Sequence, residues 1–214
     1  MTDINTLKQQ LLNTARAMNE AGLNQGTAGN VSVRVPDGFL ITPTGMLYED
    51  CTFTDMVHMS MDGDVFGSLK PSSEWRFHRD LYTSRSDAEA VVHVHSSFAT
   101  TLACVGDDIP SFHYMIAVAG GKTIRCAPYY TFGTQELSDA VVDAMVDRKA
   151  CLMGNHGMLA MGPDLKQALA MAVEVEKLCE IYWRVLQVGG GKLIGDKEMD
   201  HILKKFETYG QFNK

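Results

Sequence analysis

The sequence predicts a single-domain α/β/α sandwich over residues 1–214, with a central, largely antiparallel β-sheet flanked by helices. Helical patterns lie near both ends of the chain, and many short strand-like segments lie between them. No repeat, low-complexity stretch or linker interrupts the 214 residues, a length that suits one large domain. A hydrophobic content of 45% and a charged content of 21% are typical of a globular protein.

The first half of the chain predicts one helix followed by strands. Residues 4–20 form a helix that ends at Gly22, because apolar residues recur on one face: Ile4, Leu7, Leu11, Leu12, Ala15 and Met18. The polar segment LNQGTAGN (23–30) is a loop, and the alternating residues 31–35 form a strand. A turn at 36–38 leads to a second strand at 39–42, and a third is expected near 56–61.

The second half alternates helices with short apolar segments. A helix is expected to start within 71–74, where two serines offer capping hydroxyls and Trp75 and Leu81 can pack inward. Short apolar runs predict strands at 90–95 and 124–129. A helix at 134–149 and a strand region at 151–161, interrupted at 155–157, come next. A long helix from Pro163 to about Val188 and a short one at 197–207 complete the domain.

Charge and composition exclude several classes of protein. A formal net charge of -7 argues against binding to nucleic acids, whose phosphates require basic surfaces. No apolar run approaches the roughly 20 residues that span a bilayer, and the first 18 residues do not resemble a signal peptide. The five cysteines form no C-x-x-C pair, which indicates reduced thiols and a cytoplasmic location. The negative net charge does not exclude a small anionic substrate, because a metal ion and converging N–H groups can make the electrostatic potential positive within one site.

Three histidines form the candidate metal site. His93 and His95 are two residues apart in a predicted strand, so both imidazoles project from the same face. His156 follows a second apolar segment and precedes Gly157, which allows a sharp turn. Three histidines with an open fourth position are typical of catalytic zinc, and the alternative is a set of pocket histidines without metal. The other four histidines are expected to be core or surface residues: His58, His78, His113 and His201.

Glu74 is the candidate fourth ligand or proton-transfer group. A glutamate in a first helical turn often only complements the helix dipole. Here it follows Ser72 and Ser73, and a helix N-terminus with two hydroxyls can bind an anion. A carboxylate beside such a site could transfer protons.

Two glycine-containing segments are candidate phosphate loops. Residues 26–30 and 42–45 combine glycine with small hydrogen-bonding side chains, so their N–H groups can converge on an anion. The alternative for each is an ordinary turn. Neither segment matches a Walker A loop or the dinucleotide-binding fingerprint, so nucleotide binding is unsupported.

Taken together, these segments resemble the zinc-dependent class II aldolase and adducin-like family, whose members include fuculose-phosphate aldolases and ribulose-phosphate 4-epimerases. The resemblance covers nearly the whole chain. The matching segments are LNQGTAGNVSVR (23–34), LITPTG (40–45), PSSEWRFH (71–78), AVVHVH (90–95), HYMIAVAGG (113–121), YYTFGT (129–134), NHG (155–157) and KFETYG (205–210).

The resemblance implies one zinc ion per subunit, held by His93, His95 and His156, with Glu74 as a ligand in the free state. It also implies that Glu74 leaves the metal when substrate binds and becomes the acid/base. Tyr114 is expected to donate a proton to the aldehyde oxygen.

The remaining roles also follow from the resemblance. The residues expected to contact the phosphate are Gly29, Asn30, Thr44, Gly45, Ser72 and Ser73, with Thr27 close by. Phe132 and Tyr209 are expected to shape the aldehyde pocket. The family forms cyclic homotetramers with sites between subunits, so Tyr114 and Tyr209 are expected to enter from the adjacent chain.

The expected reaction is the reversible cleavage of a ketose 1-phosphate, first of all L-fuculose 1-phosphate, into dihydroxyacetone phosphate and L-lactaldehyde. The alternatives are 5-deoxyribulose 1-phosphate or 5-methylthioribulose 1-phosphate as substrate, epimerisation of a ribulose phosphate, and a non-enzymatic module that binds zinc and sugar phosphate. Glu74 argues against the epimerases, which have an aspartate after the two serines. Asn155 departs from the His-His-Gly pattern of the fuculose enzymes, as do Val94 and residues 96–98, and these departures concern the aldehyde preference.

Overall fold

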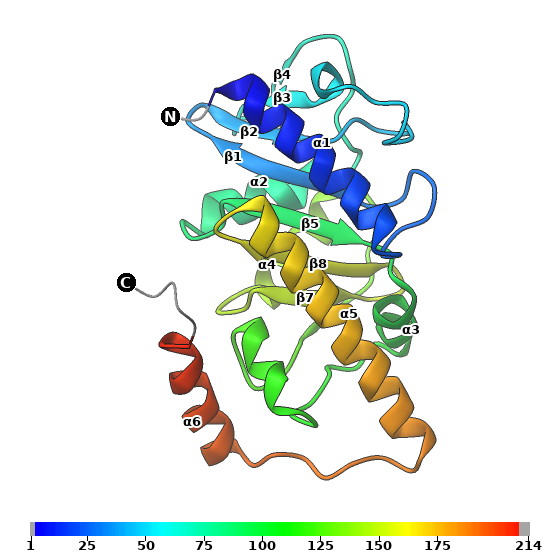
Figure 1. The fold of residues 1–214 in the computed structure, drawn as a ribbon, viewed down its shortest axis with the longest axis vertical. Helices are drawn as coiled ribbons and strands as arrows, with labels where there is room; N and C mark the ends of the chain where they lie inside the picture. The colour runs from blue at the N-terminus through cyan, green and yellow to red at the C-terminus, as the bar shows by residue number, and fades with distance from the viewer. Residues whose placement is uncertain (1–2, 210–214) are drawn as a thin grey trace.

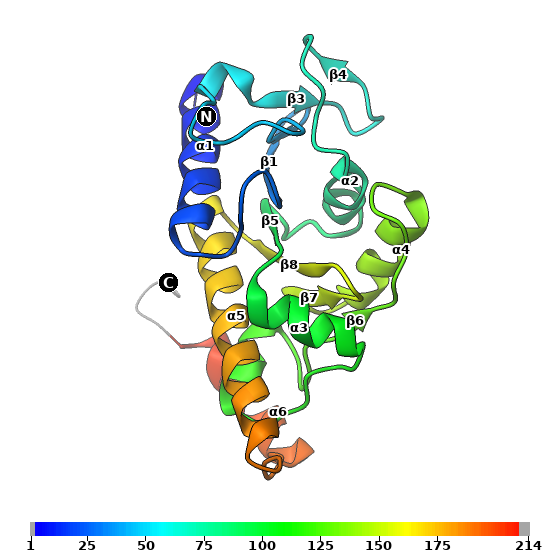
Figure 2. The same ribbon diagram turned by 90° about the vertical axis from the view of Figure 1, so that its right-hand side faces the viewer.

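The computed structural model describes residues 3–209 and shows a sheet between two layers of helices (Figures 1 and 2). Gly210, the last residue of the KFETYG segment, lies outside the described residues. The elements are α1 (Ile4–Glu20), β1 (Asn30–Val35), β2 (Gly38–Ile41), η1 (Phe53–Asp55), β3 (Val57–Met59), β4 (Val65–Phe66), α2 (Trp75–Ser84), β5 (Ala90–Val94), α3 (Ser97–Val105), η2 (Tyr114–Ala119), β6 (Cys126–Ala127), α4 (Gln135–Ala144), β7 (Ala150–Met153), β8 (Gly157–Gly162), α5 (Leu165–Gln187) and α6 (Asp196–Glu207). Within 3–209, every helix is too short or too polar to cross a bilayer.

The central sheet has eight strands in the order β4-β3-β2-β1-β5-β8-β7-β6. Every neighbouring pair is antiparallel except β6 and β7, which are parallel. The predicted sandwich with a largely antiparallel sheet is therefore confirmed. Strands β1, β5 and β8 form the middle of the sheet, and the candidate histidines lie at the ends of β5 and β8.

The helices divide between the two faces of the sheet (Figure 2). Helices α1 and α5 cover one face, and α2 and α4 cover the other. Residues along β5 alternate between the two cores: Ala90, Val92 and Val94 face α1 and α5, whereas Val91 faces α2 and α4. His93 shares the second face, since its ring packs edge-on against Phe77 of α2 with 5.4 Å between ring centroids.

Three predicted elements differ in detail. The helix predicted at 134–149 ends at Ala144, because Asp147 adopts a left-handed φ of 56°. The strand predicted at 124–129 joins the central sheet only at residues 126–127, while Ile124 forms an isolated bridge with Ile109. The strand is followed by Pro128, which has no N–H for a ladder. Neither serine of 71–74 is the N-cap of α2, since Glu74 occupies that position without a side-chain cap bond, but the Ser72 hydroxyl accepts from the Glu74 N–H at 3.3 Å.

Three helical segments among the described residues were not expected from the sequence: the single turn η1, helix α3 and the 3-10 helix η2. Helix α3 begins at Ser97, two residues after His95, and its short apolar composition gives little periodicity. The 3-10 helix η2 carries Tyr114 at its first position and packs against α6. Helix α3 and η2 are both held by contacts from distant parts of the chain, which local patterns do not reveal.

Candidate metal centre

The three histidines meet where the β7–β8 hairpin approaches the end of β5. His93 is near the end of β5, His95 follows it, and His156 lies in the three-residue hairpin loop. Gly157 is required for this approach, because a Cβ there would be 2.4 Å from the Val94 carbonyl oxygen. Asn155 adopts a left-handed φ of 52°, which turns the loop back toward β5. The local backbone therefore brings His156 next to the His93/His95 pair.

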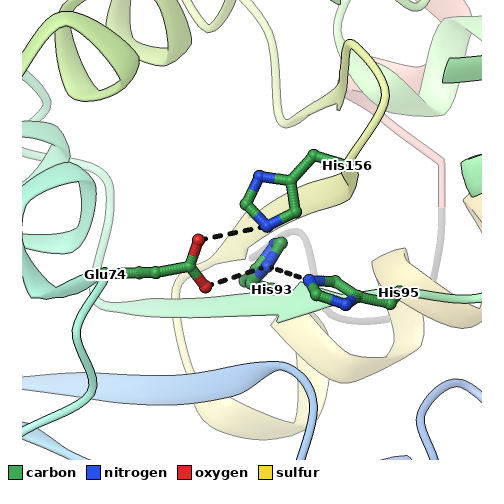
Figure 3. Close-up of side chains that lie close together, drawn as sticks. All are labelled: Glu74, His93, His95 and His156. Carbon is green, nitrogen blue, oxygen red and sulfur yellow. Dashed lines mark hydrogen bonds and ion pairs between the residues drawn. The ribbon is translucent and has the colours of Figure 1, made fainter. Parts of the chain in front are cut away.

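The donor atoms of Glu74, His93, His95 and His156 all lie within 4.8 Å of one another (Figure 3). The Nε2 atoms of His93 and His95 are 2.9 Å apart. Glu74 Oε2 is 3.2 Å from His93 Nε2, and Glu74 Oε1 is 3.1 Å from His156 Nε2. The structure thus brings together all four predicted metal residues.

This donor set fits a tetrahedral divalent ion. Bonds of about 2.0–2.1 Å place neighbouring ligands of a tetrahedral ion about 3.3 Å apart, close to the separations above. His93 Nδ1 lies 2.9 Å from the Met158 carbonyl oxygen and must donate to it, which leaves the Nε2 lone pair facing the centre. The buried Oε1 of Glu74 faces only the candidate ligand His156, whose Nε2 lies 3.1 Å away, so both atoms can turn their lone pairs to a shared ion.

The electrostatics keep the ligands in their metal-binding forms. Burial, together with the neighbouring imidazoles of His93 and His156, lowers the pKa of His95 to about 4, so its ring is neutral at pH 7. Burial alone would raise the pKa of Glu74, but the neighbouring His93 and His156 outweigh it and hold that pKa well below its usual range. The site therefore presents a neutral His95 imidazole and an ionised Glu74 carboxylate.

Three chain segments are joined beside this centre, and they include both candidate phosphate loops. The Thr42 hydroxyl accepts from Val31 N–H, and the Thr42 carbonyl accepts from Ser72 N–H at 3.0 Å. Gly29 has a φ of 72°, and a Cβ on it would be 2.6 Å from the His93 carbonyl oxygen. The Tyr48 hydroxyl donates to the Gly29 carbonyl at 2.8 Å and fixes the loop. These contacts hold the loops against the metal centre.

A pocket of about 360 Å³ opens at this junction. The predicted residues that line it are Thr27, Gly29, Asn30, Thr44, Gly45, Ser72, Ser73, Glu74, His95, Phe132 and His156. Five further residues line the pocket: Ala28, Pro43, Tyr129, Tyr130 and Asn155. From the sequence, Asn155 is only a departure that concerns the aldehyde preference, and the other four have no predicted role. The two tyrosines belong to the same YYTFGT segment as Phe132, so this segment supplies an aromatic wall.

Tyr114 and Tyr209 are not among the residues of this chain that line the pocket. Their side chains are 50% and 76% exposed, respectively. Tyr114 starts η2 and Tyr209 follows α6, and these two elements pack against each other away from the end of β5 (Figure 1). Their roles stay predictions that depend on a second chain.

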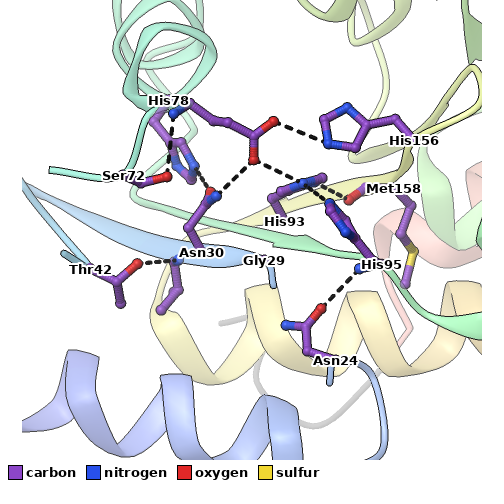
Figure 4. A network of polar contacts seen from close by, with 12 residues as sticks. Asn24, Gly29, Asn30, Thr42, Ser72, His78, His93, His95, His156 and Met158 are labelled. Carbon is purple, nitrogen blue, oxygen red and sulfur yellow. Dashed lines mark hydrogen bonds and ion pairs between the residues drawn. The ribbon is translucent and has the colours of Figure 1, made fainter. Parts of the chain in front are cut away.

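Sequence reasoning missed Asn24, and it did not foresee the contacts that Asn30 and His78 make behind the ligands (Figure 4). Asn24 accepts from the His95 N–H at 2.9 Å, and Asn30 donates to Glu74 Oε2 at 3.0 Å. His78, expected to be a core or surface histidine, is fully buried with Nε2 2.5 Å from Asn30 Oδ1. A pattern that could have indicated this is the spacing of polar residues at core-facing positions of β1 and α2.

Comparisons with known proteins identify the family of this chain. The family described as Class II Aldolase and Adducin N-terminal domain matches residues 9–183. A 5-methylthioribulose-1-phosphate/5-deoxyribulose-1-phosphate aldolase from Rhodospirillum rubrum is 52% identical over 204 residues, covering 95% of this chain and 92% of that protein. The L-fuculose phosphate aldolase of Escherichia coli K12 is 48% identical over 207 residues, covering 96% of each chain. A solved L-fuculose 1-phosphate aldolase structure matches with a TM-score of 0.90 at 39% identity, covering 94% of this chain and 95% of that one.

Proposed function

Because this chain belongs to the class II aldolase and adducin N-terminal domain family, we propose that it is a zinc-dependent enzyme that reversibly cleaves a ketose 1-phosphate into dihydroxyacetone phosphate and a short aldehyde. The chain is an aldehyde-lyase of the aldolase type, as its relatives are. The observation that carries the proposed reaction is the convergence of three imidazole nitrogens and one carboxylate beside two glycine-containing loops.

The residues that would hold zinc are His93, His95 and His156, with Glu74 as the fourth ligand in the absence of substrate. When bound, zinc supplies a Lewis acid that stabilises the negative charge that arises as the C3–C4 bond of the sugar breaks. His93 is fixed by Met158, whereas His95 is exposed at the pocket. The centre is therefore accessible to a substrate from the His95 side.

Glu74 is the group that transfers the proton at C3. Its carboxylate lies at the floor of the pocket with only 6% of the residue exposed, and its pKa is held low, so it is ionised before substrate arrives. An ionised carboxylate can accept a proton from dihydroxyacetone phosphate in the synthesis direction and return it during cleavage. This role requires Glu74 to move off the metal when substrate binds.

The phosphate is proposed to bind opposite the metal, where Gly29, Asn30, Thr44, Gly45, Ser72 and Ser73 line the pocket and Thr27 lies close by. The positive φ angles of Gly29 and Gly45 allow successive N–H groups to converge on an anion. The N-terminus of α2 adds its positive dipole next to Ser72 and Ser73. A phosphate held there would fix the register of the reacting carbons.

The residues proposed to surround the aldehyde end of the substrate come from this chain and from a neighbouring subunit. Phe132 lines the pocket of this chain, and Tyr114 and Tyr209 would come from the adjacent chain of a cyclic homotetramer. The high exposure of these two tyrosines supports that assignment. Tyr114 would exchange the proton of the C4 hydroxyl. The proposal includes a cytoplasmic location, with which the five free cysteines agree.

Two groups of substrate differ in this aldehyde end. L-Fuculose 1-phosphate, the substrate first expected from the sequence, would release L-lactaldehyde. The second candidates are 5-deoxyribulose 1-phosphate and 5-methylthioribulose 1-phosphate. Both lack the C5 hydroxyl, which in fuculose 1-phosphate becomes the hydroxyl of L-lactaldehyde. The aromatic wall of Tyr129, Tyr130 and Phe132 suits such an apolar end, and the relative named for these substrates is 52% identical. The ribulose-phosphate epimerase and the non-enzymatic module are weaker candidates, because Glu74 and the proposed Tyr114 provide for cleavage.

A product assay tests the proposal. Dihydroxyacetone phosphate is measured after the purified zinc-loaded protein is incubated with the 1-phosphates of fuculose, rhamnulose, ribulose, 5-deoxyribulose and 5-methylthioribulose. Release from at least one ketose 1-phosphate is expected, and the ratio of kcat/KM values identifies the aldehyde preference. Epimerisation of a ribulose phosphate without release of the triose, or binding without turnover, would contradict the proposed cleavage.

A further inference from the structure

A stripe of buried polar side chains runs between β1 and α2, behind the metal centre. Asn30 and Ser32 are two residues apart on β1, and His78 and Tyr82 are four residues apart on α2. All four are at most 3% exposed. Two strand residues rise about 6.6–6.8 Å and four helix residues about 6.0 Å, so the two rows can alternate along the same line.

The alternation produces a continuous chain of hydrogen bonds. Tyr82 Oη lies 2.6 Å from Ser32 Oγ, which lies 2.6 Å from His78 Nδ1. His78 Nε2 lies 2.5 Å from Asn30 Oδ1, and Asn30 Nδ2 lies 3.0 Å from Glu74 Oε2. The chain therefore connects the middle of α2 to the proposed acid/base of the active site, and Figure 4 shows the part of it that contains His78 and Asn30.

The carboxylate of Glu74 sets the direction of every bond in this chain. An ionised carboxylate only accepts, so Asn30 must turn its NH₂ group toward Glu74 and its Oδ1 toward His78. His78 must then carry its proton on Nε2 and accept at Nδ1 from the Ser32 hydroxyl. Ser32, having donated to His78, accepts from the Tyr82 hydroxyl. The reverse Asn30 orientation would place two acceptor oxygens against each other.

A neutral His78 agrees with this arrangement. Burial, aided by the nearby His93, lowers the pKa of the His78 imidazole to about 3. A charged ring would carry protons on both nitrogens and could not accept from Ser32. The stripe also stands within an otherwise apolar core of Phe39, Phe77 and Leu81, where polar groups persist only when they are bonded.

We infer that His78, although it touches neither metal nor substrate, is a positioning residue that fixes the Asn30 amide so that this amide holds Glu74 Oε2 and aims the carboxylate at the reacting carbon. The inference depends on the proposed acid/base role of Glu74. Without the His78 donor, the buried Oδ1 of Asn30 loses its hydrogen-bond partner, so the amide is no longer fixed and can shift away from Glu74 Oε2. Removal of the donor thus impairs proton transfer but leaves the three histidine ligands in place.

Variants of His78 test the inference with kinetics and metal analysis. His78→Leu is expected to lower kcat by about 10–100-fold, the range found when residues that orient active-site groups are lost, with a smaller change in KM and an unchanged zinc content. His78→Gln retains an NH₂ group that can reach Asn30 Oδ1, so it should recover most of kcat. Leu81→Ala is the matched control: it opens a cavity on the same helix in a fully buried position outside the stripe. It should lower the melting temperature and leave kcat of the folded enzyme unchanged.

Nuclear magnetic resonance of ¹⁵N-histidine-labelled, zinc-loaded protein provides a readout that does not depend on turnover. His78 should show one tautomer, protonated at Nε2, and Ser32→Ala should broaden or shift its Nδ1 resonance. Protonation at Nδ1 in the wild type would overturn the inference. So would a His78→Leu enzyme with wild-type kcat in a protein that cleaves its substrate. A wild type that cleaves no ketose 1-phosphate would instead remove the proposed function, and the role of His78 with it.

Discussion

Replacing Glu74 with glutamine changes the charge at the centre of the site but almost none of its volume. The wild-type carboxylate faces His156 Nε2 through Oε1, and His93 Nε2 and Asn30 Nδ2 through Oε2. In Glu74→Gln, the amide oxygen can still accept from Asn30. The amide nitrogen has no lone pair for a metal or a proton, so one of four metal donors and the proton-transfer group are lost together.

The size of the effect follows from this geometry. Loss of a general acid/base lowers the rate by about 10²–10⁴-fold, which corresponds to about 2.7–5.4 kcal/mol in the barrier. The three imidazoles remain, with His93 still oriented by Met158, so most of the zinc should stay bound. The expected result is a large loss of kcat with little change in KM.

Three measurements distinguish the loss of proton transfer from a structural loss of the site. They are kcat and KM for triose release, zinc content by elemental analysis, and exchange of the C3 proton of dihydroxyacetone phosphate with deuterated solvent. Asp80→Asn is the control, because Asp80 is a carboxylate on the same helix that bonds Arg79 and Ser138 away from the site. It should reduce stability without abolishing proton exchange.

Near-normal turnover of zinc-loaded Glu74→Gln would refute the assignment of Glu74 as acid/base. Loss of zinc in parallel with activity would show that Glu74 matters chiefly as a ligand. Exchange at the wild-type rate combined with slow cleavage would place the proton transfer at another residue.

Three further predictions use other features of the structure. Chelation of the metal should abolish triose release and lower the melting temperature, and added zinc should restore both; full activity of metal-free protein would require a lysine mechanism instead. Glu176→Ala should lower the free energy of unfolding, measured in urea, by about 2–4 kcal/mol, because Glu176 accepts from Ser96 Oγ and from two N–H groups at the start of α3. Glu174→Ala on the same helix is the control, and equal losses in the two variants would contradict this role of Glu176. Lowering the pH from 6.5 to 5 should reduce the free energy of unfolding by about 2 kcal/mol through His78. The pKa of His78 is about 3 in the folded protein and about 6.5 in the unfolded chain, so the unfolded chain binds the proton first. A His78→Gln protein with the same pH dependence of unfolding would contradict this.

The sequence by itself determined most of the helices and strands and the residues of the metal centre. The two-residue spacing of His93 and His95 placed both imidazoles on one side of the chain, and their Nε2 atoms do meet. The amphipathic periods gave α1, α5 and α6 within about two residues. Short-range patterns succeed here because a side chain's direction is set by the φ and ψ angles of its own element.

Only the tertiary structure decided which elements face one another. The Asn30–Glu74 bond joins residues 44 positions apart, and the Ser96–Glu176 bond joins residues 80 apart. The helical period of α2 and the strand period of β1 show that His78 and Ser32 lie on the inner faces of these elements. They do not show that the two faces oppose each other in register. That register results from packing α2 against the whole sheet, and its energy is spread over many contacts far apart in sequence. The hydrogen-bond chain behind Glu74 and the position of Tyr114 outside the pocket of its own chain were therefore visible only in three dimensions.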